Sequence, residues 1–161
     1  MKKLVLFVCL LVASVAAQAQ FEKGKWIVNP SVTGLGLSHD TGTDRTSFGL
    51  NVNGGAFVLD NIALMVHGSV QWNDKGTTTD IYSMGVGARY YFDTVGIYMG
   101  ANANVDRYDW GEITDSKFSL GLEVGYAFFL SRTVTIEPAV YWNINGDRSK
   151  FGLNVGFGFY F

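Results

Sequence analysis

The sequence predicts an all-β fold, an eight-stranded antiparallel up-and-down transmembrane β-barrel. Large apolar residues alternate with small or polar ones at a period of two over most of the chain, as in strands whose two faces meet different surroundings. Short turns alternate with longer polar connections, which divides the chain after Trp26 into four up-and-down pairs. The composition, 48% hydrophobic with 16% charged residues and 20 glycines, favours one compact domain over a disordered chain.

The first residues have the pattern of a targeting signal. Two lysines precede the apolar stretch Leu4–Ala17, which ends in an A-x-A tripeptide at 17–19. The stretch is too short for a membrane-spanning helix, which needs about 20 apolar residues. We therefore expect a cleaved secretory signal peptide over residues 1–19 and a single barrel domain over 20–161. The single cysteine, Cys9, lies in the signal, which excludes a disulfide framework.

Eight segments have the alternation of a strand. In the last of them, large apolar residues at the odd positions from Phe151 to Phe161 oppose glycine, asparagine and tyrosine. Leu35 and Leu37 leave the period of the first segment, which predicts a β-bulge near Gly34. The expected strands run over 26–37, 47–56, 62–72, 83–92, 97–106, 117–126, 134–143 and 151–161.

The connections between these strands are of two kinds. Short turns are expected at Val58–Asn61, Phe92–Val95 and Phe129–Arg132, and longer polar loops at Ser38–Thr46, Asn73–Asp80, Asp106–Ser116 and Asn143–Lys150. Short turns at one end and long loops at the other are typical of bilayer-spanning barrels. Aromatic residues gather toward both ends of the strands, where two belts at the membrane interfaces are expected.

The small and polar face is predicted to point into the barrel. An interior of eight strands accommodates only modest side chains, so the large apolar face must meet lipid. Arg89, Glu123 and Glu137 all fall on the inward face, and an arginine at the lipid midplane would cost about 2–4 kcal/mol. Counted from the short-turn end, the three lie at nearby levels, which predicts a buried charge cluster. With large inward residues and glycines making room for them, we expect a packed polar lumen that does not conduct.

Four short runs resemble the small outer-membrane β-barrel family of OmpA/OmpX-like proteins. They are the signal ending AQAQ at 17–20, the strand-turn-strand run GAFVLDNIAL at 55–64, the strand end ARYYF at 88–92 and the terminal GFGFYF at 156–161. The resemblance implies residence in the outer membrane of a Gram-negative bacterium, and it gives Phe161 the role of a C-terminal insertion signal. The AQAQ ending also resembles signals common in Bacteroidota.

The histidines are the first candidates for chemistry. His39 lies between Ser38 and Asp40, three residue types used in nucleophilic catalysis, but neighbours on a loop need not form the required relay. His67 lies on the inward face, where a buried, hydrogen-bonded histidine is the favoured interpretation over a catalytic one.

The acidic residues of the third long loop are the other candidates. Carboxylates there could surround a hard cation, but without the spacing of a calcium loop a solvated acidic loop is favoured; they are Asp106, Asp109, Glu112 and Asp115. We therefore expect no cofactor and no metal. With a net charge of −2, the chain lacks the excess of basic residues that is typical of a nucleic-acid binder.

These observations favour a non-enzymatic outer-membrane protein with an envelope-structural or surface-interaction role. A small passive pore and an enzyme that modifies envelope lipids are the alternatives. The expected partners are outer-membrane lipids, the outer-membrane insertion machinery and an extracellular ligand bound through the long loops. A monomer is expected.

Overall fold

The computed structural model describes residues 21–33, 39–40, 47–73, 80–92, 96–109, 114–146 and 148–161. The predicted signal peptide over residues 1–19, Gln20 and the bulge expected near Gly34 therefore lie outside the described residues. In these ranges, no helix is long and apolar enough to cross a membrane.

The described residues form eight long strands and two short ones. The bounds are β1 (Trp26–Thr33), β2 (His39–Asp40), β3 (Ser47–Leu59), β4 (Ile62–Asn73), β5 (Asp80–Tyr91), β6 (Ile97–Asp109), β7 (Thr114–Tyr126), β8 (Phe128–Phe129), β9 (Val134–Asn145) and β10 (Arg148–Tyr160). β2 pairs with β10, and β8 follows β7 after a break at Ala127 and pairs with β9.

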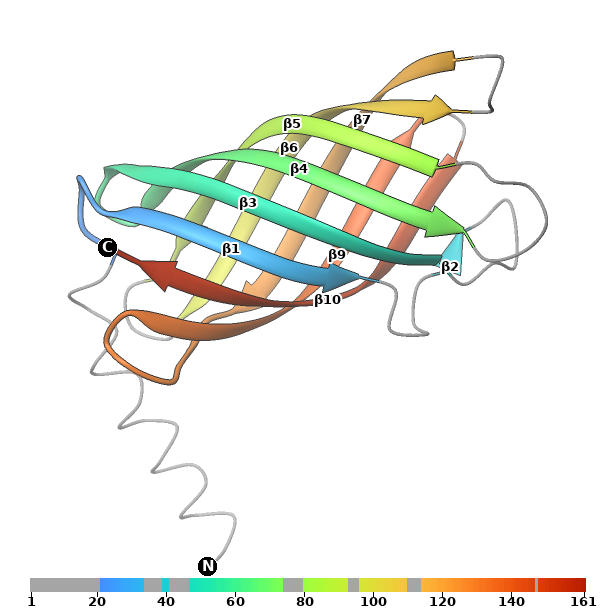
Figure 1. Ribbon diagram of the computed structural model, residues 1–161. Helices are drawn as coiled ribbons and strands as arrows, with labels where there is room; N and C mark the ends of the chain where they lie inside the picture. The colour runs from blue at the N-terminus through green and yellow to red at the C-terminus, as the bar shows by residue number, and fades with distance from the viewer. Residues whose placement is uncertain are drawn as a thin grey trace, which may run out of the picture.

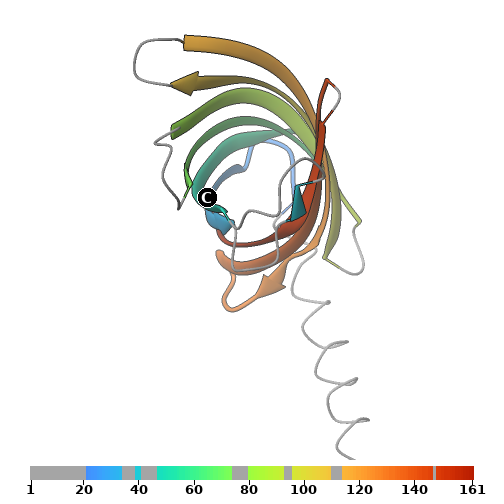
Figure 2. The same cartoon turned by 90° about the vertical axis from the view of Figure 1, so that its right-hand side faces the viewer.

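The long strands close into a ring of antiparallel neighbours. Their order is β10, β1, β3, β4, β5, β6, β7 and β9, and a β9–β10 ladder completes the circuit. Figure 1 shows the strands tilted across the barrel, and Figure 2 shows them curving round it. The predicted eight-stranded up-and-down barrel is confirmed. We call the end with the connections at 60–61 and 130–133 the turn end, and the opposite end the loop end.

The strands reach further toward the loop end than the sequence predicted. β6 continues to Asp109 and β7 begins at Thr114, although 106–116 was expected to be a loop. The β9–β10 hairpin likewise extends to Asn145 and Arg148, and Gly146 adopts a φ of 56° in its turn. Backbone ladders continue past the apolar band because their hydrogen bonds do not depend on apolar side chains. The polar composition therefore marks the end of the membrane band, not the end of the strands.

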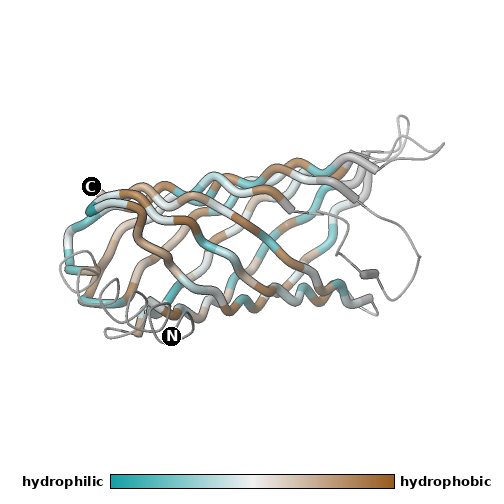
Figure 3. Tube along the Cα trace, turned by 90° about the horizontal axis from the view of Figure 1, so that it is seen from below, coloured by the Kyte–Doolittle hydropathy of each residue, from teal (hydrophilic) through white to brown (hydrophobic). Residues whose placement is uncertain are grey.

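The two faces of the wall differ as predicted. On β5, Met84 and Val86 point outward and are 72% and 62% exposed, whereas Arg89 points inward and is 1% exposed. Along the tube of Figure 3, hydrophobic and hydrophilic colours alternate on the strands. Side chains that would be core residues in a soluble protein thus form the outer, lipid-facing surface, and the lumen holds polar and aromatic side chains.

Candidate functional site: a charged layer across the lumen

Arg89 of β5 lies at the centre of a layer of charged and polar side chains that crosses the lumen. Its Nε lies 2.5 Å from Oε1 of Glu123 on β7, and its Nη1 lies 3.2 Å from Oε2 of Glu137 on β9. The guanidinium carbon is 4.6 Å from the centre of the Tyr98 ring on β6. The structure thus brings together the three charged residues that the sequence placed on the inward face at nearby levels.

Glu137 has more hydrogen-bond donors around it than the arginine alone. Its Oε2 also accepts from Asn29 Nδ2 at 2.8 Å, and its Oε1 accepts from the hydroxyls of Tyr160 at 2.7 Å and Thr135 at 2.6 Å. Charge-assisted hydrogen bonds of this kind are stronger than those between neutral groups. They offset the cost of burying the carboxylate, whose residue is 2% exposed.

The polar contacts continue round the wall from Asn29. Asn53 Nδ2 donates to Asn29 Oδ1 at 3.3 Å, and Asn53 Oδ1 lies 2.8 Å from His67 Nδ1. The charged layer therefore receives one or more side chains from every long strand. Its members are Asn29 of β1, Asn53 of β3, His67 of β4, Arg89 of β5, Tyr98 of β6, Glu123 of β7, Thr135 and Glu137 of β9 and Tyr160 of β10.

Glycines on the inward face provide the room for these side chains. A Cβ on Gly100 would lie 2.6 Å from Cγ of Glu123, which is far inside van der Waals contact. Gly125 faces the ring of Tyr98 in the same way. The glycines opposite the large polar residues are therefore part of the packing of the layer.

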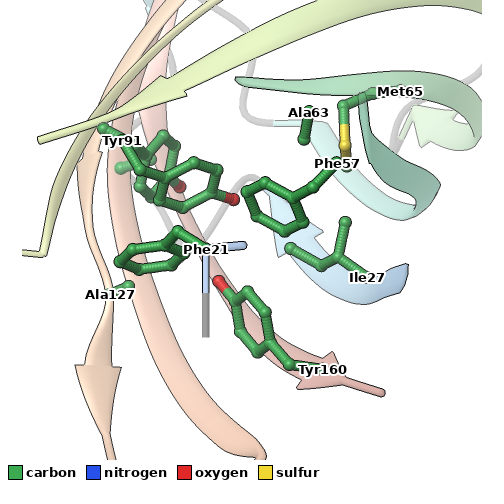
Figure 4. Packing of buried hydrophobic residues seen from close by; sticks show 10 residues of the cluster. Phe21, Ile27, Phe57, Ala63, Met65, Tyr91, Ala127 and Tyr160 are labelled. Atoms are coloured by element: carbon green, nitrogen blue, oxygen red, sulfur yellow. The ribbon is translucent and has the colours of Figure 1, made fainter. Parts of the chain in front are cut away.

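A cluster of aromatic side chains lies on the turn-end side of the charged layer. We call it the aromatic floor, and its members are Phe21, Phe57, Tyr91, Phe129 and Tyr160. Phe21 is 2% exposed and its ring centre lies 4.3 Å from that of Tyr91 and 5.8 Å from that of Tyr160 (Figure 4). Phe57 and Phe129 also approach Phe21, with ring centres at 5.9 and 5.7 Å. The carbonyl of Phe21 accepts a hydrogen bond from the amide of Asn61 at 2.7 Å, which fixes the segment against the β3–β4 turn.

Sequence reasoning missed Phe21. It precedes the first strand, so no alternation assigns it a face, and only the position next to the predicted signal distinguishes it. Asn29, which donates to Glu137, and Asn53, which donates to Asn29, were missed for a different reason. The period placed them on the inward face, but it does not show which inward side chains meet across the lumen.

The loop-end half of the lumen holds smaller polar contacts. Asp106 accepts from Ser83 Oγ at 2.6 Å and from Asn145 Nδ2 at 3.3 Å, and Asn104 Nδ2 donates to Asn102 Oδ1 at 2.7 Å. All five residues are half-buried, whereas Arg89, Glu137 and Tyr98 are buried. This half of the lumen is polar and partly exposed.

The structure describes only some of the other candidate residues. His67 is half-buried and contacts Asn53, as expected of a hydrogen-bonded lumen histidine. The backbone of His39 and Asp40 forms β2, but their side chains and all of Ser38 lie outside the described residues. The side chains of Asp109 and Asp115, and all of Glu112, also lie outside them. In the part of the chain that is described, no three histidine, cysteine or acidic residues gather as metal ligands would.

Phe161 closes the barrel at the turn end. Its backbone exchanges two hydrogen bonds of 3.0 Å with Trp26, the first residue of β1, and its side chain is 69% exposed. The C-terminal residue thus pairs with the first strand and presents its ring to the outside.

Comparison with solved structures finds the same fold in outer-membrane barrels. Neisserial surface protein A superposes with a TM-score of 0.69 at 18% sequence identity, covering 85% of this chain and 97% of that one. The N-terminal barrel domain of OprF from Pseudomonas aeruginosa gives 0.61 at 12% identity, with 86% and 98% covered. Ail of Yersinia pestis gives 0.53 at 14% identity, with 86% and 99% covered. At these identities the likeness shows the fold alone.

Sequence comparison gives the family. A search of curated proteins found no match. Residues 5–161 match the family described as the outer membrane protein beta-barrel domain, which covers the whole barrel. With the closed eight-stranded ring and the apolar outer face, this match shows that the chain belongs to the outer membrane protein beta-barrel domain family and resides in the outer membrane of a Gram-negative bacterium.

Proposed function

We propose that this protein is a non-enzymatic, non-conducting barrel that serves the cell envelope through its structure or through its surface loops. The observation that carries the proposal is the filled turn-end half of the lumen. Arg89, Glu137, Tyr91 and Tyr98 are each at most 2% exposed there, and Phe21 packs beneath them. Open aqueous channels are typical of barrels with about 16–18 strands, whereas about eight leave an interior that side chains fill.

The bonding of the carboxylates supports a structural role over a catalytic one. A general base needs a free lone pair within reach of a substrate proton. Both oxygens of Glu137 already accept hydrogen bonds, and Glu123 is held by Arg89 through both of its oxygens. The charged layer is therefore suited to holding strands together across the lumen.

A surface role is supported by the composition of the long connections. Taken together, the connections over 38–46, 73–80, 106–116 and 143–150 hold nine acidic and five basic residues, although 143–150 alone holds one acidic residue and two basic ones. One barrel of the same fold, the attachment invasion locus protein Ail, has been solved in complex with the heparin analogue sucrose octasulfate. The acidic loops of this chain suit a polyanion of that kind poorly. We infer that an extracellular ligand of these loops is neutral or cationic.

The proposal also covers export and insertion of the barrel. The signal over residues 1–19 is removed on export, and the insertion machinery recognises the terminal Phe161. The barrel then resides in the membrane as a monomer among outer-membrane lipids. Deletion of Phe161 is expected to reduce insertion, because it removes the terminal ring and two backbone hydrogen bonds to Trp26.

Three measurements on cells with and without the protein, and on the purified barrel, test the proposal. We expect unchanged lipid A and phospholipid species, unchanged uptake of small hydrophilic solutes, and no stepwise conductance in planar bilayers. A lipid species that depends on the protein would show the enzyme. Conductance steps that disappear when Tyr98 or Tyr141 is replaced by tryptophan would show the pore.

A further inference from the structure

The backbone ladder between β1 and β10 closes the barrel, and we call it the seam. This ladder is interrupted near its middle, at Asn29 and Pro30. Its paired positions include Ile27 with Tyr160 and Val28 with Phe159, and pairing resumes at Ser31 with Gly156. Trp26 exchanges backbone hydrogen bonds with Phe161, so the alternate residues of β1 turn their backbone groups toward β10. Pro30 is one of them, and it has no N–H to donate. The seam therefore lacks a backbone donor at this level.

Side chains bridge the same level of the seam. Glu137 on β9 accepts from Asn29 of β1 at 2.8 Å and from Tyr160 of β10 at 2.7 Å. Asn29 directly precedes Pro30 in the sequence. One carboxylate thus holds a side chain from each of the two strands that the seam joins.

Two glycines of β10 clear the path for this contact. Gly156 pairs with Glu137, and a Cβ on it would lie 2.9 Å from Asn29 Oδ1. A Cβ on Gly158 would collide with Oε1 of Glu137 and Oγ1 of Thr135. The side chain of Glu137 can reach across β10 to β1 because the strand between them carries no side chain at these positions.

We propose that Glu137, with Asn29 and Tyr160, is a latch that holds the barrel closed where the backbone ladder of the β1–β10 seam is interrupted. Glu123 binds the same arginine but contacts neither β1 nor β10 among the described interactions. The two carboxylates of the charged layer therefore have different roles. Glu137 secures the seam, and Glu123 secures Arg89. Loss of the latch lets β1 separate from β10 before the rest of the barrel opens.

Amide hydrogen exchange of the full barrel in lipid nanodiscs tests the latch directly. Asn29→Ala removes the β1 donor, and we expect exchange in residues 26–33 and 154–160 to become about tenfold faster, with β5 and β6 unchanged, since a hydrogen bond to a charged group is lost. Asn53→Ala is the matched control, because Asn53 donates to the same Asn29 but lies on β3. A rise of equal size with Asn53→Ala, or no rise with Asn29→Ala, overturns the proposal.

A disulfide across the seam separates the latch from a general loss of packing. Val32 and Val155 are paired across β1 and β10, whereas Val86 and Ala103 are paired across β5 and β6. Paired positions of antiparallel strands lie at distances that a disulfide can bridge. In the Glu137→Gln variant, we expect the Val32→Cys/Val155→Cys pair to restore slow exchange of residues 26–33 and 154–160. The Val86→Cys/Ala103→Cys pair, which joins β5 to β6, should not restore it.

Glu123→Gln is the control for loss of a carboxylate from the charged layer. In this variant, we expect the seam disulfide to leave amide exchange in residues 26–33 and 154–160 unchanged. Equal rescue of Glu137→Gln by both disulfides, or rescue of Glu123→Gln by the seam disulfide, would show that the layer acts as one packing unit without a latch. If Glu137→Gln does not fold, Asn29→Ala carries the same comparison with the same disulfides.

Discussion

The two halves of the lumen are built differently, although the same strands form both. At the turn end, Arg89 and most of the aromatic floor are buried, and Arg89 and Glu137 each have several partners. At the loop end, Asp106 and its neighbours are half-buried and form short, separate contacts. Buried charges are costly unless they are fully paired, whereas partly exposed ones are not. Stability is therefore expected to depend on the turn end, which leaves the loop end free to serve the surface.

The largest effect is expected from Arg89→Met, which leaves Glu123 and Glu137 buried without their cation. Breaking a buried ion pair typically costs about 3–5 kcal/mol, and we expect a loss of that size in the free energy of unfolding, measured by urea titration in detergent. Arg148→Met, near the β9–β10 turn, is the control and should change it little. Equal stability of the two variants would contradict the comparison between the halves.

The second effect is expected from Phe21→Ala, which removes the central ring of the aromatic floor. Truncation of a buried phenylalanine costs roughly 3 kcal/mol or more, and four aromatic rings surround this one. The same urea titration measures the loss, and conductance in planar bilayers should stay absent because the charged layer remains. Phe128→Ala, at an exposed ring, serves as the control. An unchanged midpoint for Phe21→Ala would mean that the segment before β1 does not close the turn end.

The sequence predicted the parts of this structure that depend on period. Alternation placed Arg89, Glu123 and Glu137 on one face, and counting from the turns placed them at nearby levels; the structure puts them in contact. Contacts across the lumen, such as Asn29 with Glu137, depend on barrel closure and strand stagger, which a local period does not contain. Phe21 lies outside any strand, so its position in the floor follows only from the three-dimensional fold.

Gly100→Ala sharpens the comparison by changing a single methyl group. The added Cβ would lie 2.6 Å from Glu123 Cγ, so it displaces a partner of Arg89. Overpacking of this kind costs about 1–3 kcal/mol, and the urea midpoint should fall accordingly. Gly54→Ala is the matched control, because nothing lies within 4 Å of a Cβ there. A larger loss for Gly54→Ala would contradict the packing of the charged layer.

The smallest effect is expected from Asp106→Asn at the loop end. The substitution keeps the shape of the side chain but removes its charge, which weakens the hydrogen bonds from Ser83 at 2.6 Å and Asn145 at 3.3 Å. Because Asp106 is half-buried, water can replace part of what is lost, so the free energy of unfolding should fall by about 1 kcal/mol or less. Glu123→Gln is the same chemical change in the charged layer and should cost several times more in the same urea titration. If Asp106→Asn lowered the free energy of unfolding as much as Glu123→Gln, the loop-end half would determine stability as strongly as the charged layer. A change in the loops would then also change the stability of the barrel.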